Sequence, residues 1–240
     1  MVALGGYLGD KILGTKRTIV LGLITLALGY LALALVNKEQ VFLALGLVCV
    51  GNGLFKTNPS SLLAKCYEKN DPRLHGGFTL YYMAINLGST FALFIGPALA
   101  SSFGYAYAYF ISFIGLVLGL ANYWFQHQHV ANIHTNADEK TIPLVHWCFV
   151  VLGIVLATLV AAYLLQHVLF AQSLVWLITA VVVAIYLLYM RRENKGACIR
   201  MLVALVLMLE AIVFFTLYQQ MPTSFAAHHG RQKAEVRSPR

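Results

Sequence analysis

Two charged side chains, Lys56 and Glu210, lie deep within long apolar segments of this 240-residue chain. A charged side chain at membrane depth costs several kcal/mol, so it is retained where it faces protein or a water-filled cavity. In such a cavity an ammonium can pair with a carboxylate ligand and respond to neighbouring protons. Both residues lie at similar depths, roughly 12 and 14 Å from the predicted cytoplasmic ends of their helices, so we predict that they approach each other in proton coupling. Two alternatives stay open: Lys56 can snorkel to the interface, and Glu210 can face other helices.

Aromatic and amide side chains form a second polar group in the same part of the chain. Asn52 precedes Lys56 by one turn, among glycines and a proline that indicate a locally loosened helix, as at transporter binding sites. Tyr82 and Asn86 are also one turn apart, so a phenol and an amide can address one ligand. Tyr81 fits an aromatic belt equally well. The residues that we predict to bind substrate are Asn52, Lys56, Tyr81, Tyr82 and Asn86.

Composition defines the class of protein. The chain is 60% hydrophobic and 11% charged, with a mean hydropathy of +0.74, which lies outside the range of soluble domains. Apolar runs long enough to cross a bilayer predict an all-α polytopic membrane protein with about seven complete transmembrane helices. They lie at about 18–37, 41–64, 77–100, 105–125, 144–166, 172–190 and 201–222.

Basic residues predict the orientation. Loops on one side contain eleven Lys and Arg, whereas those on the other contain only Lys38, so we expect the first set to be cytoplasmic. The net charge of +8 is therefore a topology signal, and no nucleic-acid partner is expected.

Other chemistry has little support in the sequence. The four cysteines have no disulfide or metal-ligand spacing, and His127, His129 and His134 fall in a polar loop. No metal or other cofactor is expected. No triad, metalloprotease motif or carboxylate pair occurs at membrane depth, so an integral-membrane enzyme is not expected.

The first residues contain a glycine-rich loop, Gly5-Gly-Tyr-Leu-Gly-Asp-Lys-Ile-Leu-Gly-Thr-Lys-Arg-Thr-Ile19. Its acidic residue can latch onto a neighbouring helix end, and its glycines permit close helix approach. The spacing G-x-x-x-D-x-x-x-G followed by a basic pair resembles the loop between the second and third helices of major facilitator transporters, although an ordinary cytoplasmic loop remains an alternative. The gate residues predicted here are Gly6, Asp10, Gly14 and Arg17.

A more specific resemblance lies in Phe78-Thr-Leu-Tyr-Tyr-Met-Ala-Ile-Asn-Leu-Gly-Ser89. This stretch resembles the F-Y-x-x-I-N-x-G-S-L signature of the proton-dependent oligopeptide transporter family, with Tyr81 in place of Phe and Thr90 in place of Leu. The glycine-rich loop and the Lys56 segment are similar to that family's loop pattern and fourth helix. The stretch Phe214-Phe-Thr-Leu-Tyr-Gln-Gln-Met-Pro-Thr-Ser224 resembles the seventh helix of its bacterial members, and 144–166 and 172–190 resemble their inserted helix pair.

The resemblance implies part of a twelve-helix major facilitator fold that imports di- and tripeptides with protons across the bacterial inner membrane. It implies that Lys56 couples peptide and proton, that Asn86 contacts the peptide backbone with Tyr82 nearby, and that the seventh helix lines the cavity through Tyr218, Gln219 and Gln220. The expected partners are small peptides, protons and the lipid bilayer. No oligomeric state is predicted.

The chain also departs from the family pattern. The family's first helix, with its E-x-x-E-R motif, would precede Met1, and many members carry an acid where this sequence has Gln219 or Gln220. We therefore keep a second hypothesis, a truncated or frameshifted product without transport activity. The expected organisation is an incomplete N-terminal bundle over 1–125, a cytoplasmic loop and inserted two-helix hairpin over 126–200, the seventh helix over 201–224, and a polar, disordered tail over 225–240.

Overall fold

The computed structural model describes residues 2–68, 71–133, 138, 143–192 and 194–237, and their backbone is almost entirely helical. It divides into two units, residues 1–171 and 172–240. Among the described residues, seven helices are long and apolar enough to cross a membrane, which confirms the predicted all-α polytopic class. Their bounds are Thr15–Leu35, Val41–Lys65, Arg73–Phe103, Tyr105–Val130, Val145–Gln166, Val168–Arg192 and Gly196–Tyr218.

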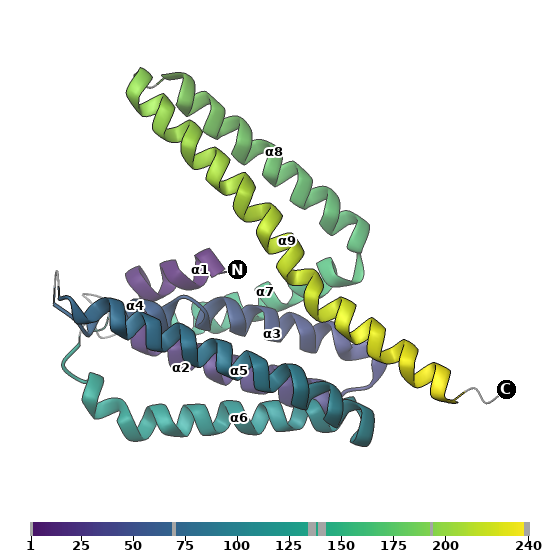
Figure 1. Cartoon of the computed structure of the whole chain (residues 1–240). Coiled ribbons are helices and arrows are strands. Elements are labelled where there is room, and N and C mark those ends of the chain that lie inside the picture. Colours follow the sequence, from purple (N-terminus) through teal and green to yellow (C-terminus); the bar gives the residue numbers. More distant parts are fainter. Residues whose placement is uncertain (1, 69–70, 134–137, 139–142, 193, 238–240) are drawn as a thin grey trace. The chain divides into compact units, whose positions relative to one another are not determined.

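Helix α2 is the centre of the first unit, where it packs against α3 and α6 (Figure 1). Helix α3 also contacts α7, and α5 pairs with α6. The helices of this unit are α1 (Val2–Tyr7), α2 (Thr15–Leu35), α3 (Val41–Phe55), α4 (Asn58–Lys65), α5 (Arg73–Phe103), α6 (Tyr105–Gln126) and α7 (Leu144–Gln166). A π-helical turn, Leu8–Ile12, joins α1 to the loop before α2.

Small residues allow α2 and α3 to approach closely. A Cβ at Gly22 would lie 2.8 Å from the backbone nitrogen of Phe55, and one at Gly51 would lie 2.6 Å from that of Leu26. Membrane helices gain little from hydrophobic burial against each other, so backbone approach of this kind provides their packing energy. Helix α3 therefore packs on α2 through the face that contains Gly51, and Lys56 lies on another, exposed face.

One cluster of buried residues lies toward the predicted cytoplasmic ends of α2 and α4. Ile19, Leu23 and Leu62 form its centre, with Phe55 and residues of α6 packed against them. Thr18 is fully buried, and its hydroxyl donates to the carbonyl oxygen of Gly14 at 2.8 Å. By contrast, α5 and α6 have no buried residues.

The second unit contains most of α8 (Val168–Arg192) and all of α9 (Lys195–Arg237). The Tyr186 hydroxyl donates to the carbonyl oxygen of Met201 at 2.8 Å and so joins the two helices. Since α7 packs on α3 while α8 bonds to α9, the assignment of residues 126–200 to a single segment stays a prediction.

The expected disordered tail differs from the structure, because α9 continues through it to Arg237. The physical reason lies in its composition. The segment Ala226-Ala-His-His-Gly-Arg-Gln-Lys-Ala-Glu235 contains several strong helix formers and only one glycine. Polar composition alone therefore does not distinguish disorder from a helical extension.

Candidate functional site

The helix that carries Lys56 is interrupted beside it. Helix α3 ends at Phe55 and α4 begins at Asn58. Pro59 has no N–H group, so it cannot donate to the carbonyl of Phe55 as a continuous helix would require. Lys56 (φ −56°, ψ −38°) and Thr57 (φ −88°, ψ −26°) keep right-handed conformations, so the interruption is local. This confirms the loosened helix that the glycines and proline predicted.

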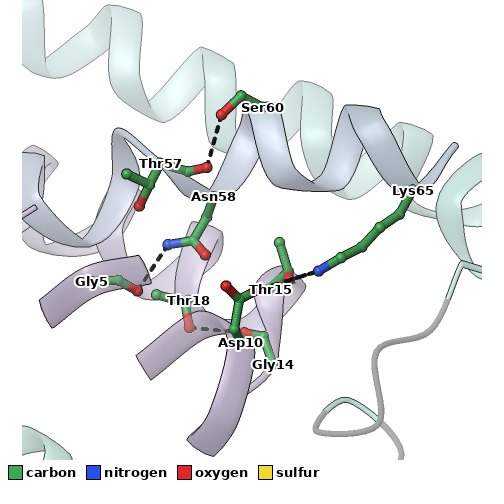
Figure 2. A network of polar contacts seen from close by, with 9 residues as sticks. All are labelled: Gly5, Asp10, Gly14, Thr15, Thr18, Thr57, Asn58, Ser60 and Lys65. Carbon is green, nitrogen blue, oxygen red and sulfur yellow. Dashed lines mark hydrogen bonds and ion pairs between the residues drawn. The ribbon is translucent and has the colours of Figure 1, made fainter. Parts of the chain in front are cut away.

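Asn58 holds the interruption together from inside the protein. Its side chain is 1% exposed, and its amide nitrogen donates to the carbonyl oxygens of Leu54, at 2.6 Å, and Gly5, at 3.3 Å. Figure 2 shows the bond to Gly5 beneath the start of α4. A Cβ at Gly9 would collide with the Asn58 side-chain oxygen. The amide thus replaces lost helical bonding and fastens α4 to α1.

Sequence reasoning did not assign Asn58 to the site. A signal was present, because an asparagine directly before proline within an apolar segment needs hydrogen-bond partners. Its partner is a backbone carbonyl 53 residues away in sequence, which no local pattern reveals.

Lys56 and Asn52 share the exposed face of α3. They are one turn apart and both exposed, whereas Gly51, Gly53 and Leu54 are buried against other helices. Within the described part of the first unit, the Lys56 ammonium has no hydrogen-bond or ion-pair partner. Its charge is therefore available to a ligand or to a neighbouring helix.

On α5, Tyr82 and Asn86 are exposed, and the Tyr82 ring lies 5.6 Å from that of Tyr81. Tyr81 is half-buried and lines a cavity of about 440 Å³ together with Phe55 and Pro59. The structure therefore brings Tyr81 to the helix interruption. Lys56, Asn52, Tyr82 and Asn86 do not line this cavity.

The predicted gate residues lie around the start of α2. Asp10 accepts from the Lys65 ammonium at 3.4 Å, and the same ammonium donates to the buried Thr15 hydroxyl at 2.9 Å. Asp10 thus contacts the end of α4 (Figure 2). Arg17 donates to the carbonyl of Leu13 at 3.5 Å. A gating role for these residues stays a prediction.

The two predicted gate glycines differ in what surrounds them. Gly14 has φ +90° and ψ 152°, and a Cβ there would meet the carboxylate of Asp138. A Cβ at Gly6 would lie 3.5 Å from the Thr57 hydroxyl, which is an ordinary contact. Of these two glycines, only Gly14 has a backbone conformation that requires glycine.

The remaining predicted residues belong to the second unit. Glu210 and Gln220 are exposed on α9, and the Tyr218 ring stacks on Phe214 with centroids 6.0 Å apart. Gln219 is described by its backbone alone, which is helical. Because Lys56 belongs to the first unit, its approach to Glu210 stays a prediction.

Among the described residues, two groups outside the membrane segments have a shifted pKa. Hydrogen bonds from the Arg73 side chain and backbone lower the pKa of Asp71 at the entrance to α5. Burial raises the pKa of the Cys66 thiol, which therefore stays protonated at neutral pH. Among the described residues no group of three metal-ligating side chains occurs, and His134 lies outside them.

In the part of the chain that the structure describes, seven membrane-length helices, one of them interrupted beside an exposed lysine, indicate a polytopic membrane protein of transporter type. The model of the POT family (PTR2) matches residues 16–235. The chain therefore belongs to the POT family, as the signature around Asn86 predicted.

Curated relatives match nearly the whole chain. It is 46% identical to dipeptide and tripeptide permease A of Chromobacterium violaceum over 95% of its own length and 47% of the relative's. It is 47% identical to dipeptide and tripeptide permease B of Photorhabdus luminescens, over 95% of its length and 48% of the relative's. The chain thus spans about half the length of the curated relatives it matches.

Solved structures agree in fold. A bacterial homologue of the human drug peptide transporters PepT1 and PepT2 is 33% identical, with a TM-score of 0.85 over 94% of this chain and 50% of that one. Tetrameric PepTSo2 is 34% identical, with a TM-score of 0.82 and the same coverage. These matches confirm the predicted partial transporter fold.

Proposed function

We propose that this chain provides part of a proton-coupled symporter of di- and tripeptides in a bacterial inner membrane. One observation carries the proposal: in a member of the POT family, an exposed lysine stands at an interrupted transmembrane helix. The names of the relatives, which are dipeptide and tripeptide permeases, support the substrate class.

Each substrate-binding residue has a chemical role in this proposal. The Lys56 ammonium pairs with the peptide carboxylate, and the Asn86 amide bonds to the peptide backbone, because an amide both donates and accepts. Tyr82 and Tyr81 offer phenol groups and ring faces, and Asn52 extends the polar face of α3 by one turn. These groups suit small zwitterionic ligands.

Proton coupling follows from competition for Lys56. An ionised Glu210 would attract the ammonium, and its protonation would release Lys56 to the peptide carboxylate. The ligand and the proton would then favour the same conformational state, which is the requirement for symport. In this proposal the Asp10–Lys65 contact stabilises one of the alternating states.

The test is peptide-driven proton uptake in proteoliposomes that contain a pH-sensitive dye. We would assay this chain and a chimaera in which it replaces the matching segment of the Chromobacterium violaceum permease. Dipeptide-dependent acidification by the chimaera supports the proposal. A monodisperse chimaera without uptake, beside an active parent permease, would instead favour the transport-inactive alternative.

The same assay tests the acid–lysine coupling. In a double-mutant cycle with Lys56→Ala and Glu210→Gln, interacting residues give strongly non-additive effects on proton uptake. Additive effects would show that Glu210 acts independently of Lys56.

A further inference from the structure

A second pocket of the first unit, which shares Tyr123 with the Tyr81 cavity, combines positive charge with aromatic and aliphatic walls. It has a volume of about 270 Å³ and is lined by residues of α2, α6 and α7. Its lining consists of Lys16, Arg17, Val20, Leu21, Ile24, Tyr123 and Trp147. None of the residues that we assign to peptide binding lines it.

The charged end of this pocket lies at one membrane boundary. Lys16 and Arg17 are in the first turn of α2, Tyr123 is in the last turn of α6, and Trp147 is in the first turn of α7. The count of basic residues predicts that all three helix ends are cytoplasmic. Trp and Tyr prefer the headgroup level, so three separate helices place interfacial residue types around one point.

The apolar wall continues from this point into the membrane. Lys16, Val20 and Ile24 follow one another at intervals of four residues, so they form one stripe along α2. Ile24 is roughly 12 Å deeper than Lys16. The cavity thus has a cationic end at headgroup depth and an aliphatic wall at acyl-chain depth.

Electrostatics favours an anion at the cationic end. The first turn of α2 contains two cations and no acidic residue. The Lys16 ammonium donates to the carbonyl of Ala131 at 3.0 Å, which leaves two of its three N–H donors for other acceptors. Among the described residues, Asp138 brings one negative charge to this end, with its carboxylate against Gly14, so the summed charge of Lys16, Arg17 and Asp138 is still positive.

We propose that this pocket is a binding site for an anionic phospholipid, with its phosphate at Lys16 and Arg17 and an acyl chain along Val20 and Ile24. Basic pockets between helices at the cytoplasmic boundary bind anionic headgroups in this manner. Trp147 would lie beside the glycerol region. The lipid would then join the inserted helix α7 to the transporter helices α2 and α6.

Quenching of Trp147 by brominated lipids tests the site directly. The chain has three tryptophans, and the other two, Trp124 and Trp176, are 70% and 75% exposed. Their replacement by Phe leaves Trp147 as the single reporter in the full chain. We would titrate this variant in detergent with dibrominated phosphatidylglycerol and, separately, with dibrominated phosphatidylcholine.

We expect phosphatidylglycerol to quench Trp147 at a concentration at least about fivefold lower than phosphatidylcholine, because each cation near an anionic headgroup contributes about that factor. In the variant Lys16→Gln/Arg17→Gln the preference should vanish. In the matched control Arg191→Gln/Arg192→Gln, which removes two exposed cations from the end of α8, it should persist.

Three results would overturn the proposal. They are equal quenching by both lipids, an unchanged preference in Lys16→Gln/Arg17→Gln, and displacement of the brominated lipid by inorganic phosphate at constant ionic strength. The last result would identify a free-phosphate site. Helical content measured by circular dichroism verifies that each variant is folded.

Discussion

The Asn58 side-chain amide donates to the carbonyl oxygen of Gly5 across 53 residues of sequence, at 3.3 Å, and thereby fixes α1 beneath the helix interruption that carries Lys56. The same amide bonds to Leu54 within its own helix. A single buried side chain therefore stabilises both the interruption and its neighbour helix. The exposed position of Lys56 depends on this support.

Replacement of this amide should destabilise the chain. Asn58→Leu removes two hydrogen bonds to the carbonyl oxygens of buried residues, so we expect a loss of about 1–3 kcal/mol in the free energy of unfolding. SDS titration monitored by circular dichroism measures it. The adjacent control is Thr57→Val, because the Thr57 hydroxyl is buried and has no hydrogen-bond partner among the described residues. That variant should be neutral or slightly stabilising, and equal losses in both would contradict the role of Asn58.

Gly14 and Gly6 should respond oppositely to substitution by alanine. Gly14→Ala forces a side chain into a conformation reserved for glycine and against Asp138, at a cost of about 1–3 kcal/mol. Gly6→Ala adds a methyl group at ordinary contact distance within a helix, where alanine is favoured by up to about 1 kcal/mol. Thermal stability in detergent distinguishes the two variants. A stable Gly14→Ala protein would show that the loop before α2 can adopt another conformation.

The Lys65 ammonium should couple more strongly to Thr15 than to Asp10. The ion pair is partly exposed, with side-chain exposures of 32% and 56%, so its coupling energy should stay below about 1 kcal/mol and weaken in salt. Thr15 is fully buried, and its hydroxyl accepts a charge-assisted bond. Double-mutant cycles with Lys65→Gln, Asp10→Asn and Thr15→Val measure the two coupling energies. A Lys65–Asp10 coupling energy that is salt-sensitive and larger than the Lys65–Thr15 coupling energy would contradict this prediction.

Much of the fold could be predicted from the sequence, because hydrophobic length and helix breakers act locally. All seven membrane segments and the interruption around Pro59 follow from such signals. The contacts of Asn58, Lys65 and Asp138 could not be predicted, since each joins residues far apart in sequence. Helix formation past Ser224 does not follow from polarity, which is equally typical of disordered segments, although the residues there favour helix.

The arrangement of the candidate residues within each helix could be predicted, whereas their role in a common site stays a prediction. Spacing within one helix correctly placed Asn52 beside Lys56 and Tyr82 beside Asn86. Spacing carries no information on whether two helices turn these faces toward one cavity. That relation is set by packing between helices, where Tyr81 alone of the predicted residues reaches the cavity at the interruption.

The central claim is that Lys56 couples peptide and proton movement, and dipeptide-driven proton uptake by the chimaera tests it most directly. Lys56→Ala should reduce this uptake by at least about tenfold, since the peptide carboxylate loses a charge partner that is worth roughly 1.5–3 kcal/mol. The control Arg191→Ala removes an exposed cation at the end of α8, which belongs to neither the proposed peptide site nor the predicted gate, and should retain measurable uptake. Uptake by Lys56→Ala equal to that of the unmodified chimaera would contradict the account.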